Sequence, residues 1–295
     1  MNQSPSVLSF SRIKKNYNNL IALNDVSFEI PNQSVFAVLG PNGSGKSTLI
    51  KILAGLITSW DGNIFFRGNS IKNKTKYLRN FGFIIEAPSF YEFLSAKKNL
   101  EIFSRLTETP MVRITEVLDL VGLLDRQFDR VSSFSYGMKQ RLGIAQTLLH
   151  NPSILVLDEP NNGLDPVGIN KMADTIYKLN HAGKTICIST HSLNEVDRLC
   201  SDVAILKKGK LIVTKHIKSG LKTKIYYRLE TTNNEEALKA INGVNGTNIL
   251  SNQNSTIIFS HKNNKTSILD NNTIKNLECI RSIHIESDLI EYFYA

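Results

Sequence analysis

The fold of this chain is decided by the stretch Gly40-Pro41-Asn42-Gly43-Ser44-Gly45-Lys46-Ser47-Thr48. It matches the phosphate-binding pattern G-x-x-x-x-G-K-[ST], in which glycines let the backbone wrap around phosphate oxygens and aim its N–H groups at them. The apolar run 35–39 predicts a buried strand before the loop, and the run 48–54 predicts a helix after it. This strand, loop and helix are the context that the motif requires.

The motif predicts a site for a nucleoside triphosphate. Lys46 can reach the β- and γ-phosphates, and the Ser47 hydroxyl is placed to bind Mg²⁺. The helix N-terminus adds partial positive charge. Together with the loop backbone and these two side chains, it leads us to expect that all of residues 40–48 contribute to phosphate binding. The alternative is a glycine-rich turn without a ligand, and the motifs further along the chain disfavour it.

Two carboxylates follow a second apolar run, Ile154-Leu155-Val156-Leu157. At the end of this predicted strand, Asp158 is expected to hold Mg²⁺ directly or through water. Glu159 is expected to orient and deprotonate the attacking water. A pair of acids that only opens a surface turn is the alternative, and it is disfavoured directly after four apolar residues.

Three further motifs narrow the family. They are Phe134-Ser135-Tyr136-Gly137-Met138-Lys139-Gln140-Arg141, Asn161-Asn162-Gly163-Leu164-Asp165-Pro166, and Ser189-Thr190-His191-Ser192 after the apolar run 185–188. With all motifs in order, residues 5 to 215 resemble the nucleotide-binding subunit of an ABC transporter. The resemblance implies an α/β fold: a P-loop NTPase core of ABC type with an antiparallel β layer and a helical subdomain.

The resemblance also implies roles for single residues, with ATP as the nucleotide. Tyr17 matches the aromatic residue that stacks on adenine, although it could be one more exposed tyrosine in a turn. Ser135 and Gly137 match the signature loop, which caps the γ-phosphate bound by a second copy of the domain. Asp165 matches the loop that crosses the dimer interface. His191 matches the histidine that contacts the γ-phosphate and holds the attacking water.

Two positions depart from the wider family. Tyr136 stands where the signature loop usually has glycine, and Glu86 stands where a glutamine usually contacts Mg²⁺ and links the site to the membrane subunit. Glutamate keeps an oxygen ligand for the metal and adds negative charge. Both departures resemble the bacitracin- and lantibiotic-type export subgroup.

The composition and charge of the chain limit which membrane and nucleic-acid interactions are expected. The 295 residues are 41% hydrophobic, and no stretch approaches the roughly 18 apolar residues that span a bilayer. The start, residues 1–5, has no basic or apolar leader, so we expect no signal peptide and a membrane part on a separate polypeptide. The net charge is +9, but its lysine clusters lie in separate predicted turns without interleaved aromatics, so nucleic acid is not expected as a partner.

The sequence predicts two domains. Residues 5–220 form the nucleotide-binding domain, with antiparallel strands around 26–30 and 63–67 and a helical subdomain at about 87–150. Residues 221–295 form a small α+β accessory domain, structural or regulatory. Its predicted elements are a strand at 224–229, a helix at 235–241, strands at 247–250 and 256–260, and a further helix. The cysteines, Cys187, Cys200 and Cys279, have no metal or redox spacing and suit a reducing cytosol.

We therefore expect the ATP-hydrolysing cytoplasmic subunit of an ABC exporter, acting on the inner face of the plasma membrane. Two such subunits, identical or different, would bind two MgATP and drive a separate transmembrane permease; an antimicrobial peptide or peptide-like antibiotic is the expected cargo. A non-transport ABC ATPase of translation or DNA repair is the alternative, but the second domain set or long coiled coil of those proteins is missing. A regulatory module without turnover is disfavoured by Glu159 and His191.

Overall fold

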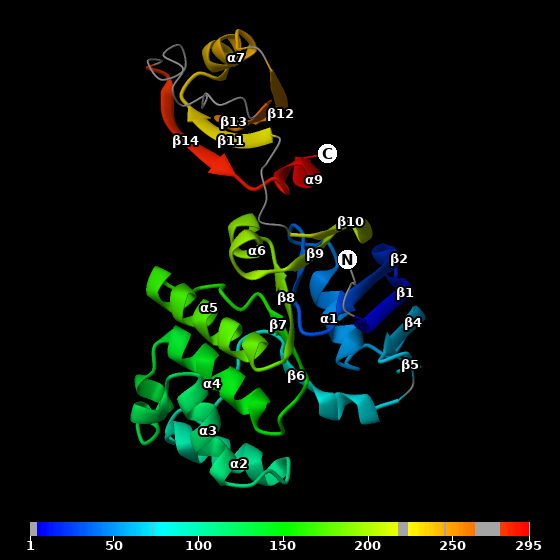
Figure 1. Cartoon of the computed structure of the whole chain (residues 1–295), viewed down its shortest axis with the longest axis vertical. Helices are drawn as coiled ribbons and strands as arrows, with labels where there is room; N and C mark the ends of the chain where they lie inside the picture. The colour runs from blue at the N-terminus through cyan, green and yellow to red at the C-terminus, as the bar shows by residue number, and fades with distance from the viewer. Residues whose placement is uncertain (1–4, 73, 218–223, 245, 263–277, 295) are drawn as a thin grey trace. The chain divides into compact units, whose positions relative to one another are not determined.

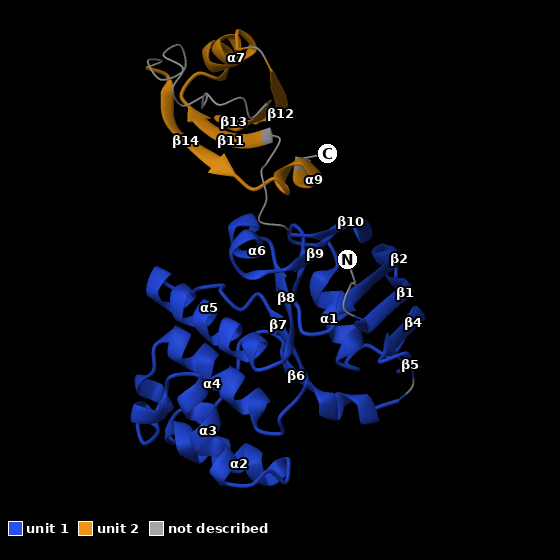
Figure 2. Cartoon of the chain, in the orientation of Figure 1, with its two compact units in different colours: residues 1–217 blue, residues 218–295 orange. Residues whose placement is uncertain are grey.

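The computed structural model describes residues 5–72, 74–217, 224–244, 246–262 and 278–294 (Figure 1). The chain divides into two compact units, Met1–Ile217 and Lys218–Ala295 (Figure 2). Each unit has a hydrophobic core of its own.

A six-stranded sheet is the centre of the first unit. Its strands lie in the order β10 (Lys210–His216), β9 (Asp202–Lys207), β3 (Val35–Leu39), β8 (Thr185–Thr190), β7 (Ile154–Asp158) and β6 (Phe81–Ile84). All neighbouring pairs are parallel except the pair of β10 and β9. Because parallel strands are covered on both faces, they consist of continuous apolar runs, and every residue of β3 is buried.

A second sheet of the first unit is antiparallel. It contains β2 (Leu20–Pro31), β1 (Ser6–Tyr17), β4 (Asp61–Phe66) and β5 (Asn69–Ser70), in that order. Its inner face reaches the central sheet through three stacked rings, with Phe28 between Phe10 (centroids 4.6 Å apart) and Phe36 (5.6 Å). The antiparallel layer predicted around 26–30 and 63–67 is thus confirmed.

Helices complete the first unit. They are α1 (Lys46–Leu53), α2 (Ala96–Leu106), α3 (Val112–Leu120), α4 (Tyr136–Leu148), α5 (Pro166–His181) and α6 (Leu193–Leu199). Short 3₁₀ turns lie at Lys76–Asn80, Leu124–Arg126 and Val131–Ser133. The helix α1 packs against β2 and β7, while α2, α3 and α4 pack on one another, so the helical segment predicted at about 87–150 is present (Figure 1). Within the described part of the chain, no helix combines the length and apolarity needed to cross a membrane.

The cysteines of the chain are free and buried. Burial raises the pKa of the Cys187 thiol to about 12 and also raises the pKa of Cys200 well above its ordinary value. Since the thiolate is the reactive form, burial disfavours reaction at these two thiols.

In its described residues, the second unit consists of an antiparallel sheet and two helices. Its strand order is β12 (Thr247–Gln253), β13 (Thr256–Lys262), β11 (Lys224–Thr231) and β14 (Ile280–Glu286). The helix α7 (Asn234–Asn242) packs on β12 and β13, and α9 (Ile290–Tyr294) packs on β12. The predicted strands 224–229, 247–250 and 256–260 and the predicted helix 235–241 are confirmed. The edge strand β14 was not predicted.

The core of the second unit predicts the effect of replacing one buried aromatic side chain by alanine. Phe259 is fully buried and stacks on Tyr227 with ring centroids 5.3 Å apart. Phe259→Ala in the full chain should destabilise this unit by about 3–5 kcal/mol, because it removes buried apolar area and leaves a cavity. Hydrogen exchange should show lost amide protection in β11, β12, β13 and β14. Ile285→Ala, at a 60% exposed position, is the control and should change stability by less than about 0.5 kcal/mol; equal protection in both variants would contradict the assigned core.

Candidate functional site

The loop between β3 and α1 has no room for side chains at its glycines. A Cβ at Gly40 would lie 2.3 Å from the Leu206 carbonyl oxygen and 2.5 Å from Ser44 Oγ. Gly45 has a φ of 104°, and a Cβ there would lie 2.6 Å from the carbonyl oxygen of Ala22. Close packing from β2 and β9 therefore fixes the loop in the form that the motif predicts.

Lys46 lies under this loop and is only 5% exposed. Its Nζ donates to the carbonyl oxygens of Gly40 (2.8 Å) and Pro41 (3.4 Å) and lies 3.4 Å from Glu159 Oε1. The ammonium is thus held at the loop and beside the carboxylate predicted to be the base.

The ends of β7 and β8 are joined through Ser189. The register of the two strands pairs Asp158 with Ser189. The Ser189 hydroxyl donates to Asp158 Oδ1, and the Glu159 N–H donates to Ser189 O (3.1 Å) and Oγ (3.0 Å). Glu159 itself has a φ of 48°, in the left-handed region. These bonds hold the strained turn that directs Glu159 away from the strand.

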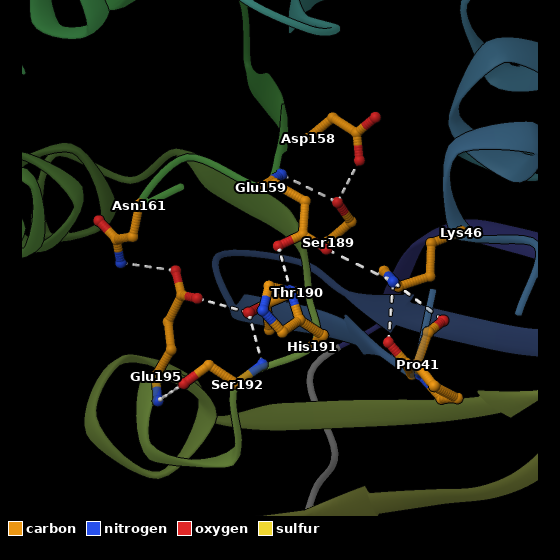
Figure 3. A network of polar contacts seen from close by, with 11 residues as sticks. Pro41, Lys46, Asp158, Glu159, Asn161, Ser189, Thr190, His191, Ser192 and Glu195 are labelled. Atoms are coloured by element: carbon orange, nitrogen blue, oxygen red, sulfur yellow. Dashed lines mark hydrogen bonds and ion pairs between the residues drawn. The ribbon is translucent and has the colours of Figure 1, made fainter. Parts of the chain in front are cut away.

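The Glu159 carboxylate lies between a lysine and a histidine. One oxygen, Oε1, faces Lys46, and the other, Oε2, is 2.9 Å from Nδ1 of His191 (Figure 3). Glu159 is 23% exposed and His191 is 55% exposed at the side chain, so water reaches both. A carboxylate in contact with solvent, oriented by an imidazole and adjacent to a buried ammonium, can take a proton from water beside bound phosphates.

Tyr17 and Glu86 are exposed, and each lies beside a lysine. Tyr17 ends β1, is 42% exposed, and its ring centroid is 4.7 Å from Lys15 Nζ. Glu86 follows β6 with a φ of 67°, and its Oε1 accepts from Nζ of Lys51, one helical turn after Ser47, at 2.9 Å. That hydrogen bond and the charge of Glu86 raise the pKa of Lys51.

The signature residues form a separate patch with the loop that follows Glu159. Ser135 caps α4 by accepting from the Met138 N–H (3.3 Å), and Asp165 caps α5 by accepting from the Gly168 N–H (2.8 Å). A Cβ at Gly137 would lie 3.4 Å from the Leu164 side chain. The structure thus brings Ser135, Gly137 and Asp165 together, apart from the contact network of Lys46, Glu159 and His191.

Sequence reasoning missed residues that contact the loops carrying Glu159 and His191. Glu195 of α6 accepts hydrogen bonds from Asn161 and Thr190, and burial raises the pKa of its carboxyl. The only sequence signal was the pattern Ser192-x-x-Glu195, which predicts a helix cap rather than part of a site. Ser189, although within a quoted motif, was given no role.

The residues present fit a triphosphate and a hard cation. Ser44 Oγ is buried without a hydrogen-bond partner at the loop, where a phosphate oxygen would supply one. Ser47, Asp158 and Glu86 offer oxygen atoms, the ligands that Mg²⁺ prefers. In the described ranges no three His, Cys, Asp or Glu side chains cluster as a metal site. This is compatible with Mg²⁺, which is usually held by one or two carboxylates and substrate phosphates.

Known proteins agree with this geometry. The family model for "ABC transporter" matches residues 23–162. The lantibiotic transport ATP-binding protein SrtF of Streptococcus pyogenes is 41% identical over 71% of this chain and 90% of its own. The bacitracin transport ATP-binding protein BcrA of Bacillus licheniformis is 40% identical over 70% of this chain and 69% of its own.

A solved structure agrees as well. The protein cbiO1 of Clostridium perfringens, part of the ABC transporter complex cbiONQ, superposes with a TM-score of 0.67 at 27% identity, covering 72% of this chain and 89% of its own. The antiparallel layer, the α/β core and the helical segment are therefore those of an ATP-binding cassette. The chain belongs to the ABC transporter family, as an ATP-binding subunit that is an ATPase.

Proposed function

We propose that this chain is the ATPase subunit of an exporter, hydrolysing MgATP in a dimer of two such subunits and driving a separate transmembrane permease. The observation that carries the proposal is the position of Glu159, between the buried ammonium of Lys46 and the imidazole of His191. A chain that only bound nucleotide would not need this pair of a base and its orienting histidine.

The residues have the following parts in hydrolysis. Lys46 and the N–H groups of residues 43–48 bind the β- and γ-phosphates, and Tyr17 stacks on adenine. Ser47, Asp158 and Glu86 would hold Mg²⁺, which would neutralise charge on the phosphates. Glu159 takes the proton of the attacking water while His191 holds that water in line. The water oxygen bonds to the γ-phosphorus, and the bond to the leaving ADP breaks.

The partners follow from the relatives and from the second patch. SrtF and BcrA are named for lantibiotic and bacitracin transport, so an antimicrobial peptide or peptide-like antibiotic is the proposed cargo. Ser135, Gly137 and Asp165 lie in a patch of their own, which supports a second subunit whose triphosphate they cap. We place the subunit at the cytoplasmic face of the plasma membrane, held there by its permease, with residues 5–220 as motor and 221–295 as an accessory domain.

The proposed base predicts the behaviour of two variants. Glu159→Gln should bind ATP and lose about 10²–10⁴-fold in kcat, because the phosphate cradle remains and the proton acceptor is gone. Lys46→Ala should lose ATP binding itself, because it removes a phosphate contact. Fluorescent-nucleotide titration and steady-state phosphate release separate the two. A Glu159→Gln enzyme with near-native turnover would refute the role of Glu159.

The second patch predicts ATP-linked association. ATP should bridge the P-loop of one copy and Ser135 and Gly137 of the other, so its binding energy is linked to dimer formation. Light scattering of Glu159→Gln should show the mass double on addition of MgATP. Lys46→Ala, measured in parallel, should keep its mass. The same mass with and without MgATP in Glu159→Gln would contradict the shared site.

The position of Glu86 predicts a metal dependence. Ionised glutamate accepts but cannot donate, and it brings charge toward the metal. Glu86→Gln should stay active but need more Mg²⁺ for half-maximal ATPase, with a larger loss of stimulation by the permease. Glu116→Gln is the control, because it removes another exposed ion pair, with Arg113, on α3. Superimposable Mg²⁺ titrations of Glu86→Gln and wild type, with unchanged permease stimulation, would contradict a role in metal binding. Glu86 would then only end a strand.

A further inference from the structure

Glu195 joins the two loops that carry the catalytic pair. Its Oε1 accepts from Asn161 Nδ2 at 2.7 Å, and its Oε2 accepts from the hydroxyl of Thr190 (Figure 3). Asn161 lies two residues after Glu159, and Thr190 directly precedes His191. One carboxylate therefore holds both loops next to their reactive side chains.

The Glu195 carboxylate does not cap its own helix, although the sequence pattern Ser192-x-x-Glu195 predicts that it would. In a capping box the glutamate would accept from the N–H of the cap residue, here Ser192. Instead, the Ser192 N–H donates to Thr190 Oγ1 (3.0 Å), while Ser192 Oγ accepts from the Glu195 N–H (3.3 Å). The helix cap is thus satisfied by Thr190 and Ser192, and both oxygens of Glu195 are available for contacts outside the helix.

Beyond the strands, the two loops border a hollow of the surface. The ladder of β7 and β8 runs to the pair Asp158 and Ser189, and the chain then turns on both sides. A cavity of about 320 Å³ borders these turns and is lined by Glu159, His191 and Glu195 among others. Since hollow space adjoins the pair Glu159 and His191, side-chain ties are expected to contribute to its geometry, in addition to the bonds from the Glu159 N–H to Ser189.

The hydrogen bonds that join Asn161, Glu195 and Thr190 are largely shielded from solvent. Thr190 is 1% exposed, and Asn161 Oδ1 is buried without a partner, so the amide of Asn161 is held in place through its Nδ2 bond to Glu195. Burial raises the pKa of Glu195, while the hydrogen bonds from Thr190 and Asn161 act in the opposite direction. Burying a carboxylate is costly unless donors compensate it, and these two donors offset part of that cost.

We propose that Glu195 is a positioning residue for hydrolysis: by tying Asn161 to Thr190, it holds Glu159 against His191 at the distance that water activation requires. The proposal rests on the proposed function, and it differs from a role in helix stability alone. A helix-stabilising Glu195 would change the melting temperature, whereas a positioning Glu195 changes kcat while ATP affinity stays constant.

The test compares variants of the full chain. Glu195→Ala should lower kcat about 10- to 100-fold, as expected for a reacting group displaced by about 1 Å, with less than about twofold change in the dissociation constant for a fluorescent ATP analogue. Glu195→Gln should recover most of kcat, because its amide can form both contacts once Asn161 reverses its own amide. Lys178→Ala, at an exposed residue of the neighbouring helix α5 that does not line the cavity, is the control and should match wild type.

Coupling between variants gives the second criterion. Asn161→Ala should lower kcat, and the double variant with Glu195→Ala should lose no more than the single variants, because one tie is removed in each case. Thr190→Val tests the other arm without removing the carboxylate and serves if Glu195→Ala fails to fold. Because Thr190→Val also removes the acceptor of the Ser192 N–H, Thr190→Ser, which keeps the hydroxyl, is its matched control and should retain kcat. Native kcat in folded Glu195→Ala or in Thr190→Val, or additive losses in the double variant, would overturn the proposal. Absence of ATPase in the wild type would instead overturn the proposed function.

Discussion

The parallel pairing of β3, β8 and β7 is the constraint on which the site depends. Parallel strands bring their carboxyl ends to one edge of the sheet, so the P-loop after β3, the carboxylates after β7 and the histidine after β8 meet there. The register fixes their depth along that edge, since Asp158 is level with Ser189. A slip of one residue would turn Asp158 to the other face and separate Glu159 from His191.

Backbone strain is concentrated at this edge. Glu159 and Glu86 both have positive φ, where a side chain costs roughly 1–2 kcal/mol relative to the ordinary regions. Each follows a strand of the central sheet, β7 or β6, and each directs a carboxylate out of the strand. The bonds from Glu159 to Ser189 compensate part of that cost. Strain of this kind is retained where a side chain must be aimed, and here it aims the proposed base and a proposed metal ligand.

The sequence predicted the core of this structure because its motifs carry their own local geometry. The P-loop, the carboxylates and His191 each follow an apolar run. The strands before them, and the sheet edge that they share, could therefore be predicted from the sequence. The contacts of Glu195 could not be predicted, because its local pattern indicates a helix cap and its hydrogen bond with Asn161 joins residues 34 positions apart in the sequence. The edge strand β14 was missed for a related reason: its burial follows from pairing with the distant β11. The roles of all the predicted site residues, Tyr17 and Glu86 included, stay predictions.

The burial of all native thiols has a practical consequence for spectroscopy. Cys187, Cys200 and Cys279 lie inside the two units, so maleimide reagents would find a nearly silent background under native conditions. A single cysteine introduced at Val167, which is 59% exposed beside Asp165, would then carry a spin label or fluorophore without replacement of the native cysteines. Distances between labels on two copies would report the closing of the dimer around nucleotide in an otherwise unmodified chain.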